Sequence, residues 1–247
     1  MSAGIDYRKL LVILAAIALL APLAASLGAA SLAPSTPPAQ VAKPEIEKYE
    51  TTIASIANST ITVTKGGEAI ELLAKGRWFL VTDELVKLVP WSEAASYIEE
   101  GDALVVAATV SRANRTVDVL LGLKQGDVAL FRPILLRYWA KRHVHTKSYV
   151  SVKGQIAHKG SNYFTIEREG RRGLVVVRGE WLKAGGGEVT WEEVADEFRI
   201  GDTVRIFCHN VLIMGEDFAE TFDIGAFIWG YSGAIIDLTS GVTISKA

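Results

Sequence analysis

The chain has 247 residues, of which 49% are apolar and 22% charged, and this composition is typical of a packed globular protein rather than a disordered one. The formal net charge of -2 gives no long-range attraction for a polyanion, so nucleic acid is not expected as a partner. The single cysteine excludes an intrachain disulfide and a four-cysteine metal site, and the scarcity of Cys and Met resembles the composition of a thermophile's protein.

The first 33 residues predict export. Residues 10–33 carry no charge and directly follow Arg8 and Lys9. About 20 helical residues span the hydrocarbon of a bilayer, and basic residues stay on the cytoplasmic side. We therefore expect residues 1–9 to be cytoplasmic, residues 10–33 to cross the cell membrane once, and the rest to lie outside. A cleaved signal peptide is the alternative, since small residues follow the apolar run, and cleavage would give a secreted protein.

Residues 34–47 contain several prolines among small residues, which predicts an extended linker. The remainder contains an internal repeat. Residues 53–78 match residues 156–181 without a gap, including a Gly-x-Trp step in each copy. After a loop of different length, residues 91–102 match residues 191–202, each ending in Gly-Asp. A match of this extent indicates duplication of one structural unit.

Each copy shows three alternating segments with polar turns, a short helix that begins at a tryptophan, and further strands. In the second copy Thr190 and Glu193 form a predicted capping box at the start of that helix. A fourth strand follows the Gly-Asp step. We expect the fifth strand near residues 116–123 and 218–224, and a closing strand within residues 225–236, matched by 128–136 in the first copy.

This order of elements resembles the OB-fold, a small barrel with a helix between its third and fourth strands. The predicted fold class is mainly β, with two tandem OB-like barrels that each carry one short helix, behind an N-terminal transmembrane or signal helix. The predicted domains are residues 48–131 and 148–247, joined by a basic connector at residues 132–147. A β-sandwich or another small barrel is the alternative. The resemblance is one of fold alone and implies no function.

The connector is rich in cations and aromatic residues and contains no acid, so it is the first candidate for a binding site. It could bind lipid headgroups, an anionic surface polymer or an acidic partner. Alternatively, its charges pair with acids of the barrels such as Glu99 and Glu100. The candidates in the connector are Arg132, Arg137, Tyr138, Trp139, Lys141 and Arg142.

Trp78 and Trp181, which stand beside the loops of unequal length, are further candidates for a binding surface. His143 and His145 share one face of an expected strand and could hold a transition metal with His209 as a third ligand. Cys208 is instead expected to be a small core residue, which turns His209 outward. We therefore predict no metal and no cofactor.

Four acids, Glu216, Asp217, Glu220 and Asp223, crowd one connection of the second copy. Their spacing matches no EF-hand loop, so a solvated turn is expected rather than a calcium site. Asn58 and Asn114 each begin an Asn-x-Thr sequon in a predicted turn and are candidates for glycosylation.

No catalytic motif such as Gly-x-Ser-x-Gly, His-Glu-x-x-His or Cys-x-x-Cys is present, and Asp102 and Asp202 are interpreted as turn residues. We therefore predict a non-enzymatic, membrane-anchored extracytoplasmic protein of the cell envelope. It would act as a binding or structural module, with an envelope protein, an anionic polymer or another copy of itself as partner. The alternatives are a pilin-like filament subunit with the N-terminal helix in the polymer core, and an anchored protein that delivers a cofactor or metal.

Overall fold

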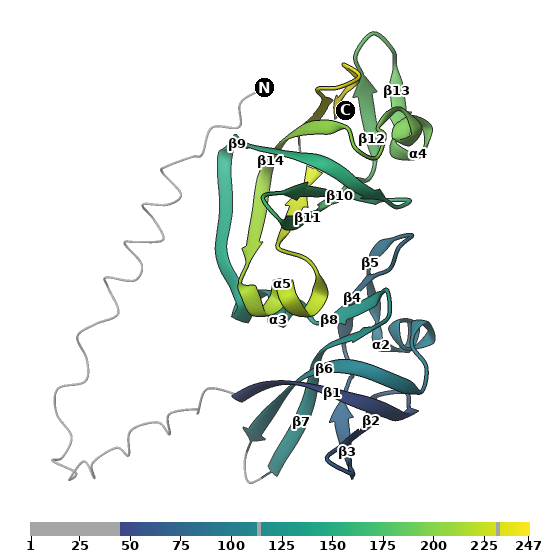
Figure 1. The fold of residues 1–247 in the computed structure, drawn as a ribbon, viewed down its shortest axis with the longest axis vertical. Coiled ribbons are helices and arrows are strands. Elements are labelled where there is room, and N and C mark those ends of the chain that lie inside the picture. Colours follow the sequence, from purple (N-terminus) through teal and green to yellow (C-terminus); the bar gives the residue numbers. More distant parts are fainter. Residues whose placement is uncertain (1–44, 113–114, 231–232) are drawn as a thin grey trace, which may run out of the picture. The chain divides into compact units, whose positions relative to one another are not determined.

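The computed structural model describes residues 45–112, 115–230 and 233–247 (Figure 1). The predicted membrane or signal segment, nearly all of the linker, and Asn114 lie outside the described residues. Within the described part, no helix combines the length and apolarity needed to cross a membrane. Residues 43–247 form one compact unit that contains both copies of the repeat.

The first copy is a closed five-stranded barrel. Its strands are β1 (Glu45–Ile56), β2 (Thr60–Lys65), β3 (Glu68–Leu73), β6 (Gly101–Arg112) and β7 (Arg115–Gln125). They run in the order β3-β2-β1-β6-β7, and a parallel contact between β3 and β7 at Leu73 and Val119 closes the barrel. The elements inserted or added around it are β4 (Arg77–Val81), β5 (Val86–Pro90), α2 (Trp91–Ala94), η1 (Ala95–Tyr97) and β8 (Val128–Phe131).

The second copy repeats this plan. Its barrel strands are β9 (Ala140–Lys159), β10 (Tyr163–Arg168), β11 (Arg171–Val176), β14 (Thr203–Met214) and β15 (Ala226–Trp229). Strand β15 pairs in parallel with β11, and β14 pairs with β9, so this barrel also closes. The other elements are β12 (Glu180–Lys183), β13 (Glu188–Thr190), α4 (Trp191–Val194), η2 (Ala195–Glu197), α5 (Glu216–Phe222), β16 (Ala234–Asp237) and β17 (Thr243–Lys246).

The predicted OB-like fold is confirmed. Going around each closed barrel from its first strand, the order is first, second, third, fifth and fourth strand, and the third and fifth strands are parallel. In both copies a short helix precedes the fourth strand. At the start of α4, the Glu193 carboxylate accepts hydrogen bonds from the Thr190 backbone N–H at 2.6 Å and from its hydroxyl at 3.1 Å. These bonds lower the pKa of Glu193 and confirm the predicted capping box.

The prediction of the fifth strand was correct in the first copy and wrong in the second. Residues 216–222 form α5, and the fifth barrel strand is β15, which lies in the stretch expected to close the fold. The four-residue spacing of Phe218 and Phe222 places them on one face of a strand or of a helix, so the spacing does not distinguish the two. Both rings are buried. Residues 128–136 are likewise not one strand, since Pro133 begins helix α3 (Pro133–Trp139) directly after β8.

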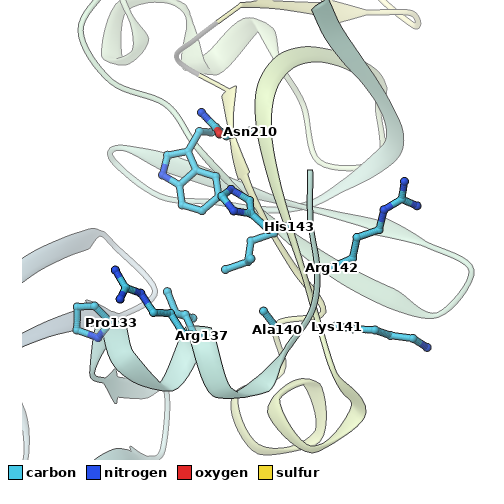
Figure 2. A pocket seen from close by; sticks show the side chains of 10 residues that line it. Pro133, Arg137, Ala140, Lys141, Arg142, His143 and Asn210 are labelled. Carbon is cyan, nitrogen blue, oxygen red and sulfur yellow. The ribbon is translucent and has the colours of Figure 1, made fainter. Parts of the chain in front are cut away.

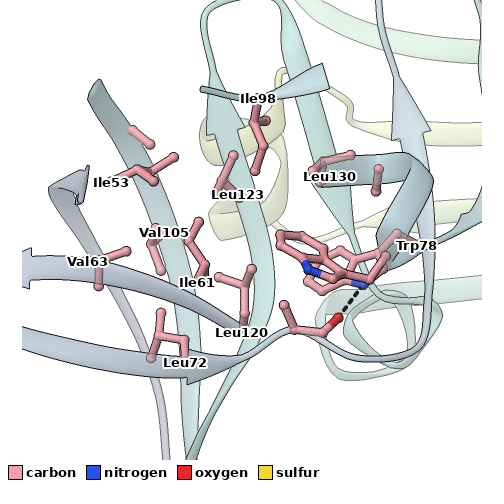
Figure 3. Close-up of a cluster of buried hydrophobic side chains, with 14 of the residues drawn as sticks. Ile53, Ile61, Val63, Leu72, Trp78, Ile98, Val105, Leu120, Leu123 and Leu130 are labelled. Atoms are coloured by element: carbon pink, nitrogen blue, oxygen red, sulfur yellow. Dashed lines mark hydrogen bonds between the residues drawn. The ribbon is translucent and has the colours of Figure 1, made fainter. Parts of the chain in front are cut away.

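Each barrel has its own apolar core around a pair of tryptophans. In the first barrel the indole rings of Trp78 and Trp91 lie 5.3 Å apart, and Trp78 Nε1 donates a hydrogen bond of 2.7 Å to the carbonyl of Ala74 (Figure 3). The second barrel buries Trp181 and Trp191 at the equivalent positions. The repeated tryptophans are therefore core residues in both copies.

A third apolar cluster lies between the two barrels and packs them against each other. At its centre Phe131 of β8 contacts the rings of Phe218, Phe222 and Phe227, with centroid distances of 5.2, 5.3 and 5.6 Å. Beside it, the Asn162 side chain bonds both the N–H and the C=O of Val86, each at 2.8 Å. The shared cluster and these bonds hold the two barrels against each other.

Candidate ligand-binding cleft

A cleft lined by cationic and apolar residues lies where helix α3 leads into strand β9 (Figure 2). Its volume is about 570 Å³, within the usual range of small-molecule sites. Helix α3 forms one side, and the adjacent strands β9, β14 and β15 of the second barrel form the other. The lining residues are Pro133, Leu136, Arg137, Ala140, Lys141, Arg142, His143, Asn210, Leu212 and Trp229.

Helical spacing explains which side chains of α3 reach the cleft. Pro133, Leu136 and Arg137 lie three and four residues apart and therefore share one face, and both Leu135 and Leu136 pack into the core between the barrels. The chain then leaves the helix at Ala140 and enters β9, which pairs with β14. The Gly215 N–H donates a hydrogen bond of 2.7 Å to the Trp139 carbonyl and fixes this corner.

The rim of the cleft is cationic. Arg137, Lys141 and Arg142 are exposed, and among the described residues no carboxylate lies within ion-pair distance of any of them. The structure does not show these cations paired with Glu99 or Glu100, which was the alternative interpretation. The backbone of Glu99 is instead held by the Gln125 side chain. The cleft therefore combines three cations with an apolar floor and has no acid in its lining. Lys141 also lines a neighbouring cleft, which contains Glu216, Glu220 and Asp223.

The other connector candidates have different surroundings. Arg132 lies outside the cleft, where its guanidinium donates a hydrogen bond of 2.9 Å to the Leu73 carbonyl and lies 5.1 Å from the Trp78 ring centroid. Burial lowers the pKa of Arg132, and its environment is that of a structural residue. Trp139 is half-buried against Phe218, with ring centroids 6.0 Å apart, while Tyr138 is exposed on the flank of α3.

Trp78 and Trp181 have no exposed surface, so they do not form the binding surface suggested by their position near variable loops. Six lining residues were not singled out from the sequence: Pro133, Leu136 and Ala140 within the connector, and Asn210, Leu212 and Trp229 outside it. Leu212 belongs to a continuous apolar run, residues 211–214, and Trp229 to the stretch expected to form a closing strand. Neither pattern distinguishes a residue that faces the core from one at the edge of a cleft.

The histidines do not converge on one point. His143 lines the cleft, and the rings of His143 and His145 lie 6.3 Å apart. His145 Nδ1 bonds the Asn210 side chain, whereas His209 stacks on Tyr149 at 4.3 Å between ring centroids. The described residues contain no group of three or more His, Cys, Asp or Glu side chains placed to hold a metal ion.

Cys208 is fully buried in the second barrel, as expected, and burial raises the pKa of its thiol to about 11. We predict that the native full chain will not react with a thiol-specific disulfide reagent at pH 8. The same chain should react completely in concentrated guanidinium, where the thiol regains an ordinary pKa. Absorbance of the released thiolate measures both rates, and rapid labelling of the native chain would contradict the buried position.

The acidic group of the second copy lies on α5 rather than in a turn. Glu220 pairs with Lys48 at 3.8 Å, and Asp223 pairs with Arg172. Two of these acids therefore already have cationic partners. Asn58 is exposed between β1 and β2, a position compatible with glycosylation. Asn114 lies outside the described residues.

The fold and the cleft together define a tandem OB-like protein with one cationic, apolar-floored cleft between an inter-barrel helix and the second barrel. No protein-family model matches the sequence, and no curated protein matches it.

Proposed function

We propose that this chain is a membrane-anchored extracytoplasmic protein of the cell envelope, and that its two barrels form a non-enzymatic module that binds an anionic ligand in the cleft. The uncharged run of residues 10–33 supports the attachment to the membrane. The cations at the rim support the choice of ligand, because Arg137, Lys141 and Arg142 line the cleft, are exposed, and have no carboxylate within ion-pair distance in the described part of the chain. An anionic ligand would pair with these exposed cations.

The proposal predicts that the full chain, reconstituted in neutral phosphatidylcholine nanodiscs, binds tripolyphosphate saturably. The double substitution Lys141→Glu and Arg142→Glu should abolish this binding, because it reverses two of the three rim charges. Binding by wild type should also weaken as salt is added, since exposed charges are screened. Calorimetric titration measures the affinity.

Lys153 and Arg205 provide a matched control. They lie opposite each other on β9 and β14, are exposed, and do not line the cleft. The double substitution Lys153→Glu and Arg205→Glu makes the same change in net charge on the same two strands and should leave the affinity within about twofold of wild type. An equal loss of affinity for tripolyphosphate in both double variants would show a nonspecific charge effect. No binding of tripolyphosphate by the wild type would refute the proposed function.

A further inference from the structure

We propose that the ligand of the cleft is an anionic amphiphile, in which a phosphate or carboxylate head contacts the cationic rim and an apolar chain covers the floor. This inference rests on the proposed function and makes it more specific. Anion binding alone requires only the rim. The amphiphile is inferred from the floor, from the surface next to it, and from the size of the cleft.

The floor of the cleft is apolar. Leu136 and Leu212 are only 7% and 8% exposed and belong to the core between the barrels, so the accessible apolar surface comes mainly from the exposed Pro133 and the half-buried Trp229. A bare inorganic anion at the rim would leave the surface of Pro133 and Trp229 hydrated. A chain of methylene groups would displace that water, which is favourable in proportion to the apolar area covered.

The apolar surface continues beyond the cleft along α3. Ile134 and Tyr138 lie one helical turn apart on the flank next to Arg137 and are 41% and 43% exposed. An apolar chain longer than the cleft would therefore extend over a surface that is also apolar. Of the three cations, Arg137 lies on α3 next to this path, whereas Lys141 and Arg142 point to the opposite side of β9 (Figure 2). A head bound at Arg137 and a chain on this path can therefore belong to one molecule.

The size of the cleft favours a single amphiphile over a polymer. Its volume of about 570 Å³ is that of a site for one small molecule. The cations occur on one short stretch, residues 137–142, rather than along an extended groove. A polymer would need a row of cations along its length, whereas one anionic head needs only a cluster.

The test is a chain-length series with the full chain in neutral phosphatidylcholine nanodiscs, with empty nanodiscs as the reference for partitioning. The probes are inorganic phosphate, butyl phosphate and hexyl phosphate, with hexyl glucoside as the uncharged control. A fully buried methylene raises affinity by about fourfold. Because the cleft is open on one side, we expect hexyl phosphate to bind at least about tenfold more tightly than inorganic phosphate. Leu212→Ala, which removes part of the floor, should reduce that gain.

The outcomes separate this inference from the proposed function. Equal affinity for inorganic and hexyl phosphate would overturn the amphiphile and leave anion binding standing. Equal affinity for hexyl glucoside and hexyl phosphate would also overturn it, because the rim charges would then play no part. No binding of any phosphate would refute the proposed function itself. The chain-length series uses unchanged protein, so it remains decisive even if Leu212→Ala does not fold.

The head and chain could belong to a bilayer lipid or to a free amphiphile, and a second arm distinguishes these sources. In nanodiscs that contain phosphatidylglycerol, a lipid already in the cleft would prevent hexyl phosphate from binding. Unchanged binding of hexyl phosphate would identify a free amphiphile as the ligand. Either result supports the same chemistry of recognition.

Discussion

Replacing Phe131 with alanine should lower the free energy of unfolding of the full chain by about 3–5 kcal/mol. Phe131 is fully buried at the centre of the cluster between the barrels, and its ring contacts four other aromatic rings. Its removal would leave a cavity that α5 and β8 cannot fill without moving closer together. Guanidinium denaturation in neutral detergent, followed by tryptophan fluorescence, measures the change.

Phe164→Ala provides the comparison, because Phe164 is equally buried but belongs to the core of the second barrel alone. Both variants should lose stability. Only Phe131→Ala should weaken the contact between the barrels, so proteolysis within α3 should become faster relative to global unfolding. A loss below about 1 kcal/mol, or equal proteolysis in the two variants, would show that the barrels do not depend on this cluster.

The sequence predicted the parts of the fold that repeat. The gapless match of the two copies, with glycines and alternating apolar residues in register, identified two barrels and the helix within each. The prediction failed where the two copies differ in sequence. Residues 216–222 have no counterpart in the first copy, and a pair of phenylalanines four residues apart is consistent with either a strand or a helix.

The site was only partly predictable for a related reason. Its cations form one acid-free run, so Arg137, Lys141 and Arg142 could be recognised from the sequence. The floor could not, because Leu212 and Trp229 reach the cleft through the pairing of β14 with β9 and β15. Burial of Trp78 and Trp181 also could not be inferred from the variable loops beside them, since both side chains lie on strands, β4 and β12, that point them into the cores.

The two copies no longer present the same surface. On the outer face of the second barrel, Tyr163 and Leu174 are buried in the cluster between the barrels. The matching residues of the first barrel are Thr60 and Glu71, which are polar and not buried. The second barrel therefore uses this face to pack against the first barrel. The cleft is present only because helix α3 joins the two barrels. Duplication has supplied a scaffold, and the candidate site arises from the junction.

Gly122 should be intolerant of any side chain, because helix α5 lies directly against β7 at this point. A Cβ atom at Gly122 would lie 2.6 Å from Phe222 Cζ and 3.1 Å from Leu135 Cδ2. Gly122→Ala should therefore cost about 1–3 kcal/mol through overpacking. Gly187→Ala is the control, since a Cβ atom at Gly187 would have no neighbouring atom within 4 Å, and we expect a change below about 0.5 kcal/mol.

A double-mutant cycle tests whether this cost arises from the contact between the copies. Phe222→Ala alone should destabilise the chain by about 3–5 kcal/mol, because it removes a buried ring. Once that ring is absent, the methyl group of Gly122→Ala has space, so the double variant should lose less than the sum of the single losses. Additive losses would mean that Gly122 is required by the first barrel itself. Coupling of about 1 kcal/mol or more would show that this glycine is required for the second copy to pack against the first.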